Sequence, residues 1–510
     1  MTARARLAGA MARPRTLELY AALAAVALSA LVMAHLLLSS RATLLTEDAD
    51  SVLLPLLRGS ILEGRGFDPA SSPVLFFPEF VAHAVLTGIG LDARIALIVQ
   101  GLLQLVAFYV ALRLLAGAVV RQRRPAVAAL GAFTVVVVLS LIESSPSRDS
   151  IEIVSLLATT TYYASTVIAV PLALSFALRA LRRPRPLALL GLVTTAAIAT
   201  LTNPLFVAWL AAPLLGVLVL AVVLRRVRLL PATIVTLATA IGCGVGWIAR
   251  TPFSSTIVAH ADDYLKPDSA VSTLKELVRE VLAHSQSVAG VVALIVMGLV
   301  AAATIASLVH GLRARDAGAT VVALFGIVAP IVCVAGMLYL GNGSPRYFMP
   351  LWIAPVCALL VMPIPRLRRG ILLAGSSVVA VASLVIAAAA VPSTPAAIAE
   401  ASDDACLTQW VDSHDEIGVG QYWTVRAAKA YSAHPSRLLQ VTYTLHPYEW
   451  IVNRIDFRGV DRASYVVTGG SAGDAALLKA ADAEARPESV ATCGRFTITD
   501  YGAPVIVVQR

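Results

Sequence analysis

Three carboxylates lie within four residues of one another in the stretch LLTEDADSVL, just after a long apolar run. They are Glu47, Asp48 and Asp50, and the run before them covers residues 19–38 without a charged side chain. A carboxylate in such a place can act as a general base toward a hydroxyl group, or it can bind a divalent metal ion. A solvated loop would tolerate the same cluster, so the function of these residues depends on the elements that hold them.

The composition of the chain is that of a membrane protein. Hydrophobic residues make up 58%, charged residues 14%, and the mean hydropathy is +0.80. A membrane-spanning helix needs about 20 mostly apolar residues, and eleven such segments are predicted. The predicted fold is an all-α polytopic membrane domain over residues 1–391, followed by a small α/β domain over residues 392–510. The predicted spans are 19–38, 95–118, 126–142, 163–180, 187–201, 204–224, 230–249, 288–310, 318–340, 348–364 and 370–391.

The arginines predict the orientation of these spans. If the N-terminus is cytoplasmic, the cytoplasmic segments hold eighteen arginines and one acid, Asp316, whereas the alternate loops are mixed or acidic. This agrees with the positive-inside rule, and it places the carboxylate cluster and the C-terminal domain on the extracytoplasmic side. The net charge of +9 is then a topology signal, and no nucleic-acid partner is expected. The arginine-rich segments are 4–15, 121–124, 182–185, 225–228, 313–315 and 366–369.

One apolar segment, 72–91, conflicts with this count, because a span there would invert every later loop. We interpret it as a juxtamembrane helix at the outer interface; a tilted span with a compensating helix elsewhere is the alternative. Glu79 and His83 are four residues apart in this segment and therefore share a helix face. Together with Glu47, they are weak candidates for binding an acceptor.

The C-terminal segment differs in composition from the rest of the chain. After the linker-like VPSTPAA, a helical pattern precedes short β-rich runs that alternate with two further helical stretches, as in a small α/β domain. Cys406 and Cys493 are the cysteines of this segment, and a lone pair outside the cytoplasm most often forms a disulfide. Aromatic residues also gather here, which suggests either glycan binding or packing within the domain and against the membrane. These residues are Tyr422, Trp423, His446, Tyr448 and Trp450.

Taken together, these features resemble the GT-C-type membrane glycosyltransferases, and especially the bacterial relatives of protein O-mannosyltransferases and lipid A aminoarabinose transferases. The motifs behind the resemblance are EDAD at 47–50, FFPEF at 76–80 and SPRYFMP at 344–350. The family pattern is Asp-Glu or Asp-x-Asp. Asp48-Ala49-Asp50 fits the second form, whereas Glu47-Asp48 reverses the first, so the base stays open between Asp48 and Asp50.

The resemblance implies a sugar transferase of the bacterial inner membrane that uses a polyprenyl-phosphate-linked sugar. Asp48 or Asp50 would remove the proton of a hydroxyl acceptor (a glycan, lipid or protein), and the anomeric centre would invert. Arg346, beside Tyr347, is the candidate for binding the donor phosphate, because a guanidinium suits a bidentate phosphate contact. A divalent metal ion, Mg²⁺ or Mn²⁺, would bind through Asp48 and Asp50 if one is used.

Two other classes of protein remain open at this stage. A transporter of lipid-linked glycans would also have many spans, but it should show internal repeats and discontinuous helices, and the sequence shows no convincing repeat. A non-catalytic membrane protein could function through its C-terminal domain, and its EDAD stretch would then be replaceable.

Overall fold

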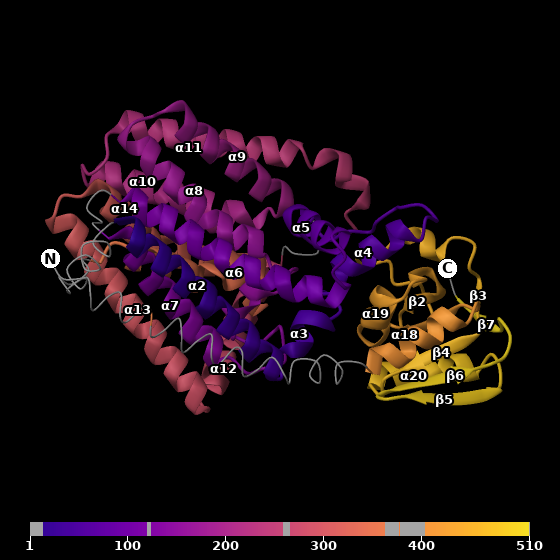
Figure 1. Cartoon of the computed structure of the whole chain (residues 1–510). Helices are drawn as coiled ribbons and strands as arrows, with labels where there is room; N and C mark the ends of the chain where they lie inside the picture. The colour runs from indigo at the N-terminus through magenta and orange to yellow at the C-terminus, as the bar shows by residue number, and fades with distance from the viewer. Residues whose placement is uncertain (1–13, 120–123, 259–265, 363–376, 378–402, 509–510) are drawn as a thin grey trace, which may run out of the picture.

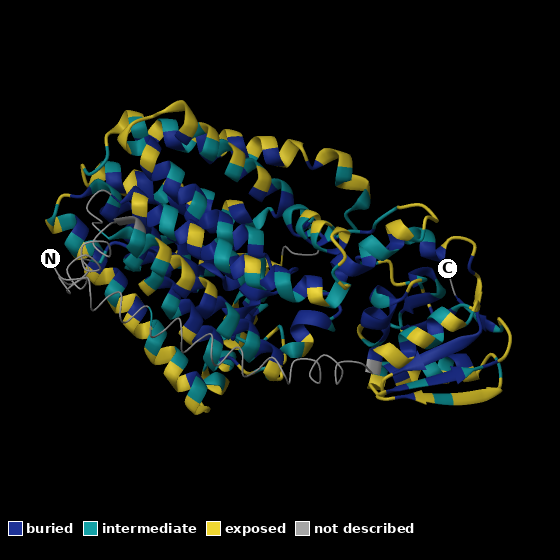
Figure 2. Ribbon diagram, in the orientation of Figure 1, coloured by how far each residue is buried: buried dark blue, intermediate teal, exposed yellow. Residues whose placement is uncertain are grey.

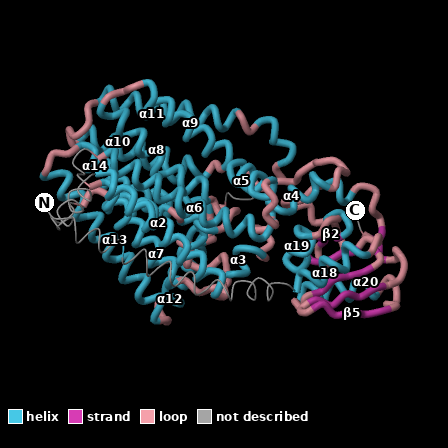
Figure 3. Tube along the Cα trace, viewed as in Figure 1, coloured by secondary structure: helices cyan, strands magenta, loops and turns pink. Residues whose placement is uncertain are grey.

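The computed structural model describes residues 14–119, 124–258, 266–362, 377 and 403–508. Within these residues, a bundle of helices is joined to a smaller domain at one end, and that domain holds the strands (Figures 1 and 3). The predicted span at 370–391 and the predicted boundary between residues 391 and 392 lie outside the described residues.

Seven helices in the described part of the chain are long and apolar enough to cross a membrane. On α13 (Val288–Arg313), the apolar side chains of Ile295, Leu299 and Ile305 are more than half exposed. In water, such an exposed apolar surface would promote association with other proteins. In a membrane, it is in contact with lipid tails. The chain is therefore a multi-pass membrane protein. The other six long helices are α2 (Pro14–Leu38), α6 (Ala93–Ala118), α7 (Pro125–Ile142), α8 (Ala164–Arg182), α11 (Leu229–Ile248) and α14 (Ala317–Leu340).

Shorter helices complete the bundle. The predicted spans at 187–201 and 204–224 correspond to α9 (Pro186–Thr202) and to a π-helical turn (Val207–Ala211) that continues into α10 (Ala212–Val223). Figure 2 shows that buried residues follow the inner faces of the helices. The remaining short helices are α3 (Ala42–Thr46), α4 (Leu53–Leu62), α5 (Phe77–Gly88), α12 (Ala270–His284) and α15 (Pro350–Leu359), and the 3₁₀ turns are Ser155–Ala158, Thr251–Thr256, Pro267–Ser269 and Pro345–Phe348.

Two predicted segments differ in extent from the structure. In the described part of the segment 348–364, the α-helix is α15, which begins at Pro350 and contains Pro355, where a proline removes one backbone hydrogen bond. The segment 72–91 contains α5, a helix of 12 residues, which is too short to span a bilayer. The prediction that 72–91 is not a span agrees with this length.

A buried arginine organises the loop between α7 and α8. Arg41 is 1% exposed and pairs with Glu152 (3.1 Å) and Glu143 (3.7 Å). Glu143 accepts hydrogen bonds from the backbone N–H groups of Val154 and Ser155. A buried charge is stable only when it is paired and hydrogen-bonded, so this network fixes the path of the loop that leads to the candidate site.

The C-terminal domain is built on a mixed five-stranded sheet in the order β2-β1-β4-β6-β5. Strand β1 is parallel to β2 and β4, and β6 is antiparallel to β4 and β5. A second, two-stranded sheet pairs β3 with β7. The strands are β1 (Gly418–Gln421), β2 (Leu438–Val441), β3 (Arg462–Ala463), β4 (Tyr465–Thr468), β5 (Ser489–Cys493), β6 (Phe496–Asp500) and β7 (Ile506–Val507), and the helices are α18 (Asp403–Ser413), α19 (Tyr422–Tyr431) and α20 (Ala472–Asp482), with 3₁₀ turns at Pro435–Arg437 and Arg454–Phe457.

The predicted disulfide between Cys406 and Cys493 is confirmed, with the two Cα atoms 5.4 Å apart. It ties α18, at the start of the domain, to β5 near its end. Such a cross-link restricts the unfolded chain and so stabilises the folded domain.

The C-terminal domain packs directly against the membrane part. Val52 and Leu56 at the start of α4 belong to the same hydrophobic cluster as Val419 of β1 and Leu439 of β2. The Tyr431 hydroxyl donates a hydrogen bond to the Thr46 carbonyl (2.5 Å). The short segment between the carboxylates and α4 is thus shared by the two parts of the molecule.

Candidate active site

Asp48 and Asp50 lie just after α3, where backbone hydrogen bonds hold the chain in a tight turn. The Asp48 carboxylate accepts hydrogen bonds from Arg148 (2.7 Å to Oδ2) and from the Tyr162 hydroxyl (2.7 Å to Oδ1). Burial raises the pKa of the Asp48 carboxyl above its usual value, and the negative charge of Asp50 acts in the same direction, whereas Arg148 and Tyr162 oppose the shift. A raised pKa brings a carboxyl group closer to the range in which it exchanges protons at neutral pH.

Asp50 is held from two sides. Its Oδ1 accepts a hydrogen bond from the Tyr422 hydroxyl of α19 (2.9 Å), and its Oδ2 lies 3.6 Å from Arg346 Nη1. The 3.6 Å between Asp50 Oδ2 and Arg346 Nη1 is short enough for an ion pair but too long for a hydrogen bond. Asp50 Oδ2 is therefore free to accept a proton, and it faces a fixed positive charge.

Arg346 is the predicted residue that the structure brings closest to the carboxylates. Its Nε and Nη1 atoms are buried and make no hydrogen bond within the described residues. Asp149 lies 3.8 Å from Nη1, and Tyr347 stacks on Tyr163, with ring centroids 5.9 Å apart. Buried donors without partners are costly, so a ligand that accepts hydrogen bonds, such as a phosphate, would satisfy them.

Tyr163 adopts an unusual backbone conformation next to this site. Its φ is 69°, in the left-handed region that only glycine adopts easily. Such local strain persists where the surrounding structure enforces it, and it often accompanies functional sites. Here it turns the chain sharply between Tyr162, which contacts Asp48, and the first residue of α8.

The three weaker candidates lie in different environments. Glu47 forms an ion pair with Arg495 of the C-terminal domain (3.6 Å). Glu79 is 2% exposed and accepts a hydrogen bond from the backbone N–H of Ser165 at the N-terminus of α8 (3.0 Å). His83 is fully buried. Binding of an acceptor by these residues stays a prediction, and their observed contacts are with neighbouring elements.

Burial also shifts the pKa values of Glu79 and His83, the two ionisable residues of α5. It raises the pKa of Glu79. It lowers the pKa of His83 to about 4, and the nearby Arg58 acts in the same direction. His83 is therefore neutral at neutral pH.

Three site residues were not singled out from the sequence: Arg148, Tyr162 and Tyr422. Arg148 and Tyr162 belong to the loop between α7 and α8, and Tyr422 was considered only as one of the aromatic residues of the C-terminal domain. An arginine next to an acidic residue in a loop, as in Arg148-Asp149, is only a weak indication of a functional site. The sequence around Tyr422 gives no such indication.

The donor set of the site does not fit a divalent cation. In the described part of the chain, three or more acidic, histidine or cysteine side chains are nowhere grouped as metal ligands. Asp48 and Asp50, the expected ligands, each face an arginine, and a hard cation needs several oxygen ligands without a competing positive charge. No step of the reaction proposed below uses a metal ion.

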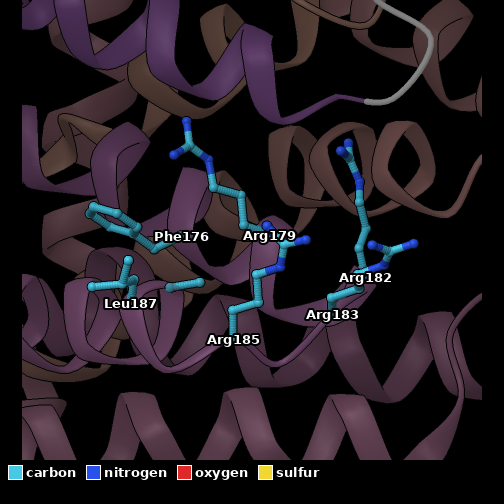
Figure 4. Close-up of a pocket in the computed structure, with 7 residues that line it drawn as sticks. Phe176, Arg179, Arg182, Arg183, Arg185 and Leu187 are labelled. Atoms are coloured by element: carbon cyan, nitrogen blue, oxygen red, sulfur yellow. The ribbon is translucent and has the colours of Figure 1, made fainter.

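A second group of charges lies at the opposite end of α8. A cavity of about 480 Å³ is lined there by four arginines with Phe176, Leu187 and Ala188 (Figure 4). Eighteen residues of helix separate this end of α8 from the carboxylate end, which corresponds to about 27 Å. The cavity is thus not part of the candidate active site. Its arginines are Arg179, Arg182, Arg183 and Arg185.

No protein-family model and no curated protein match this sequence. Among solved structures, the fold is similar to that of ArnT from Cupriavidus metallidurans bound to undecaprenyl phosphate, with 14% identity, a TM-score of 0.53, and coverage of 96% of this chain and 98% of that one. The apo oligosaccharyltransferase of Archaeoglobus fulgidus is less similar, with 12% identity, a TM-score of 0.48, and coverage of 88% and 69%. The similarity to ArnT shows that the chain has a GT-C-type fold.

Proposed function

We propose that this protein is a membrane glycosyltransferase that moves a sugar from a polyprenyl-phosphate donor to a hydroxyl acceptor. The observation that carries the proposal is the pair of carboxylates, each facing an arginine, at one end of a bundle with the GT-C-type fold. The structure of ArnT, which has a similar fold, contains undecaprenyl phosphate, and a donor of that chemistry suits the unsatisfied N–H groups of Arg346.

Asp50 is the proposed general base. Its Oδ2 is free of hydrogen bonds from the described residues, whereas both oxygens of Asp48 accept hydrogen bonds. Asp50 takes the proton of the acceptor hydroxyl while the acceptor oxygen bonds to C1 of the sugar. The bond between C1 and the phosphate oxygen breaks on the opposite face of the sugar ring, so the anomeric configuration inverts. The polyprenyl phosphate leaves with the electron pair.

The two arginines stabilise the leaving phosphate. Arg346 Nε and Nη1 and Arg148 Nε are buried N–H donors without hydrogen-bond partners in the described residues. Asp149 lies within 4 Å of both guanidinium groups, 3.6 Å from Arg148 and 3.8 Å from Arg346, and so holds them near each other. Donors that are positioned in advance at a developing negative charge lower the barrier without reorganisation. In this mechanism Asp48 keeps Arg148 in place and does not itself transfer a proton.

Release of polyprenyl phosphate is the direct test of this function. The protein in lipid nanodiscs is incubated with a panel of labelled polyprenyl-phosphate sugars and a cell-envelope extract as the source of acceptors. We expect release from at least one donor, with the label moving to an acceptor, and the Asp48→Asn/Asp50→Asn double variant is the matched control. Equal release by the double variant, or none by the wild-type protein from any donor, would refute the proposal.

The proposal also places the reaction on the extracytoplasmic face, which follows from the arginine distribution of the sequence. A cysteine introduced at the exposed Arg65, between α4 and α5, should react with an impermeant maleimide added to intact cells, whereas one introduced at Arg183 should react only after the membrane is opened. The opposite labelling pattern would invert the proposed topology.

A further inference from the structure

Aromatic side chains of the C-terminal domain lie immediately beside the two carboxylates. Tyr422, which contacts Asp50, has its ring centroid 4.6 Å from that of Trp423 and 5.2 Å from that of Tyr448. The Arg148 guanidinium lies 3.8 Å above the Trp423 ring. The C-terminal domain thus supplies one wall of the site.

Two of these rings are left open to the surroundings. Trp423 is 50% exposed and Tyr448 is 38% exposed, whereas Tyr422 is 2% exposed. Other large aromatic residues of the domain, such as Tyr465 and Phe496, are buried, whereas Tyr443 is exposed. An exposed aromatic surface next to a candidate active site indicates a binding surface.

The open rings are held in fixed positions. Arg426 of α19 and Gln440 of β2 are fully buried and hydrogen-bonded to each other (2.6 Å). The Gln440 side chain donates to the carbonyls of Tyr448 (2.6 Å) and Trp450 (2.8 Å), and Arg426 Nε donates to the Ala49 carbonyl (3.3 Å). One buried network therefore fixes α19, the aromatic loop and the carboxylate stretch relative to one another, as a binding site requires.

The polar groups of a cavity formed partly by residues 446–449 are electrically balanced. This cavity of about 690 Å³ near Tyr448 is lined by charged residues of both signs and by His446. Asp68 pairs with Arg458 (2.6 Å) and Arg454 (3.5 Å), and Arg454 pairs in turn with Glu449 (3.6 Å). Because these charges neutralise one another, the surface suits a neutral ligand with many hydroxyl groups better than an anion.

We propose that α19 and residues 446–450 form the acceptor side of the active site and bind a neutral saccharide against Trp423 and Tyr448. This inference rests on the proposed function, because it names the class of the hydroxyl acceptor. The negative face of an aromatic ring attracts the C–H groups of a sugar ring, and side chains such as His446 and Glu449 hydrogen-bond sugar hydroxyls. Trp423 packs on an arginine that pairs with Asp48, so its ring belongs to the charged site and does not serve as a lipid anchor.

Saccharide binding by the full chain in nanodiscs tests the proposal without the donor. The probes are methyl tetrasaccharides of mannose, galactofuranose and arabinofuranose, titrated by calorimetry. We expect at least one to bind, and Trp423→Ala to weaken that binding at least about tenfold, because the stacking surface is lost. Trp423→Phe keeps an aromatic face and should retain most of the affinity. Tyr443→Ala is the matched control, since Tyr443 is in the same loop, is 59% exposed and is not one of the rings clustered around Tyr422.

The outcomes separate this proposal from the proposed function. Asp50→Asn should bind the saccharide as the wild-type protein does but release no polyprenyl phosphate. If the wild-type protein releases no polyprenyl phosphate yet binds a saccharide through Trp423, the transferase function fails and the saccharide site stands. Failure of every probe to bind, or equal binding by the wild-type protein and Trp423→Ala, overturns the saccharide site. So does a loss of lipid association in Trp423→Ala with saccharide binding unchanged.

Discussion

Both ends of α8 carry charge, but the two sets of charges are arranged in different ways. At the Ala164 end, Asp48 pairs with Arg148 and Asp50 with Arg346. At the Arg182 end, four arginines line a cavity whose lining residues include no acid (Figure 4). Arginines at a helix end are a signal of membrane orientation and can reach water or lipid head groups. Burying opposite charges next to each other costs desolvation free energy. Such an arrangement is typical of a catalytic site.

Substitution of the proposed base, Asp50, should cause the largest loss of polyprenyl-phosphate release. Asp50→Asn keeps the size of the side chain but removes the proton acceptor, and we expect the rate of polyprenyl-phosphate release to fall by ~10²–10⁴-fold. Asp48→Asn should cost less, because an amide oxygen still accepts a hydrogen bond from Arg148 or Tyr162. Single-turnover kinetics on both variants measure the two losses. A larger loss for Asp48→Asn would transfer the role of base to Asp48.

Arg346→Ala should have the next largest effect. The variant removes the guanidinium that faces Asp50 Oδ2, and loss of one positioned donor at a developing charge typically costs ~10²-fold in rate. Arg346→Lys keeps the charge but lacks the fork of N–H groups, so its rate should fall between those of Arg346→Ala and the wild-type protein. A rate for Arg346→Ala within about twofold of wild type would show that the leaving phosphate is bound elsewhere.

The long helices were predictable because an apolar segment of about 20 residues has few stable arrangements in a bilayer. The alternation of apolar and polar residues predicts most strands and helices of the C-terminal domain. It does not identify β5. Its residues Ser489 and Val490 are both exposed, so the strand lacks the alternation of apolar and polar residues that identifies a half-buried strand.

The candidate site was predictable only in part. Asp48 and Asp50 stand out because they are close in sequence, and Arg346 stands out because it lies in the SPRYFMP motif and a guanidinium suits a phosphate contact. The residues that contact these carboxylates were not predictable. Arg148 is 100 residues from Asp48, and Tyr422 is 372 residues from Asp50. Which arginine or tyrosine meets a given carboxylate depends on how the loops and the C-terminal domain pack, and no local pattern carries that information.

A change in pH dependence should follow substitution of Arg148. The Asp48 carboxyl has a raised pKa, and the charge of Arg148 opposes that rise. Protonation of Asp48 weakens its hold on Arg148, so activity should fall as pH decreases through this raised pKa. Arg148→Gln leaves no guanidinium for Asp48 to hold, so protonation of Asp48 no longer affects the leaving-phosphate site. We expect the part of the acid limb of the kcat/KM profile that reflects Asp48 to be absent in Arg148→Gln. An acid limb at the same pH in both proteins would show that Asp48 does not control it.

The smallest effect is expected at the other end of α8. In the double variant Arg183→Gln/Arg185→Gln, two of the four arginines that line the distal cavity lose their charge. These positions lie beyond the Arg182 end of α8, and α8 is about 27 Å long from Ala164 to that end, so the variant should leave the contacts of the carboxylates unchanged. Release of polyprenyl phosphate should stay within about twofold of wild type once the rate is normalised to the amount of correctly inserted protein. A drop of tenfold or more in the rate of polyprenyl-phosphate release per correctly inserted protein would mean that the arginine end contributes to turnover, and the division of α8 into a catalytic end and an orienting end would then be wrong.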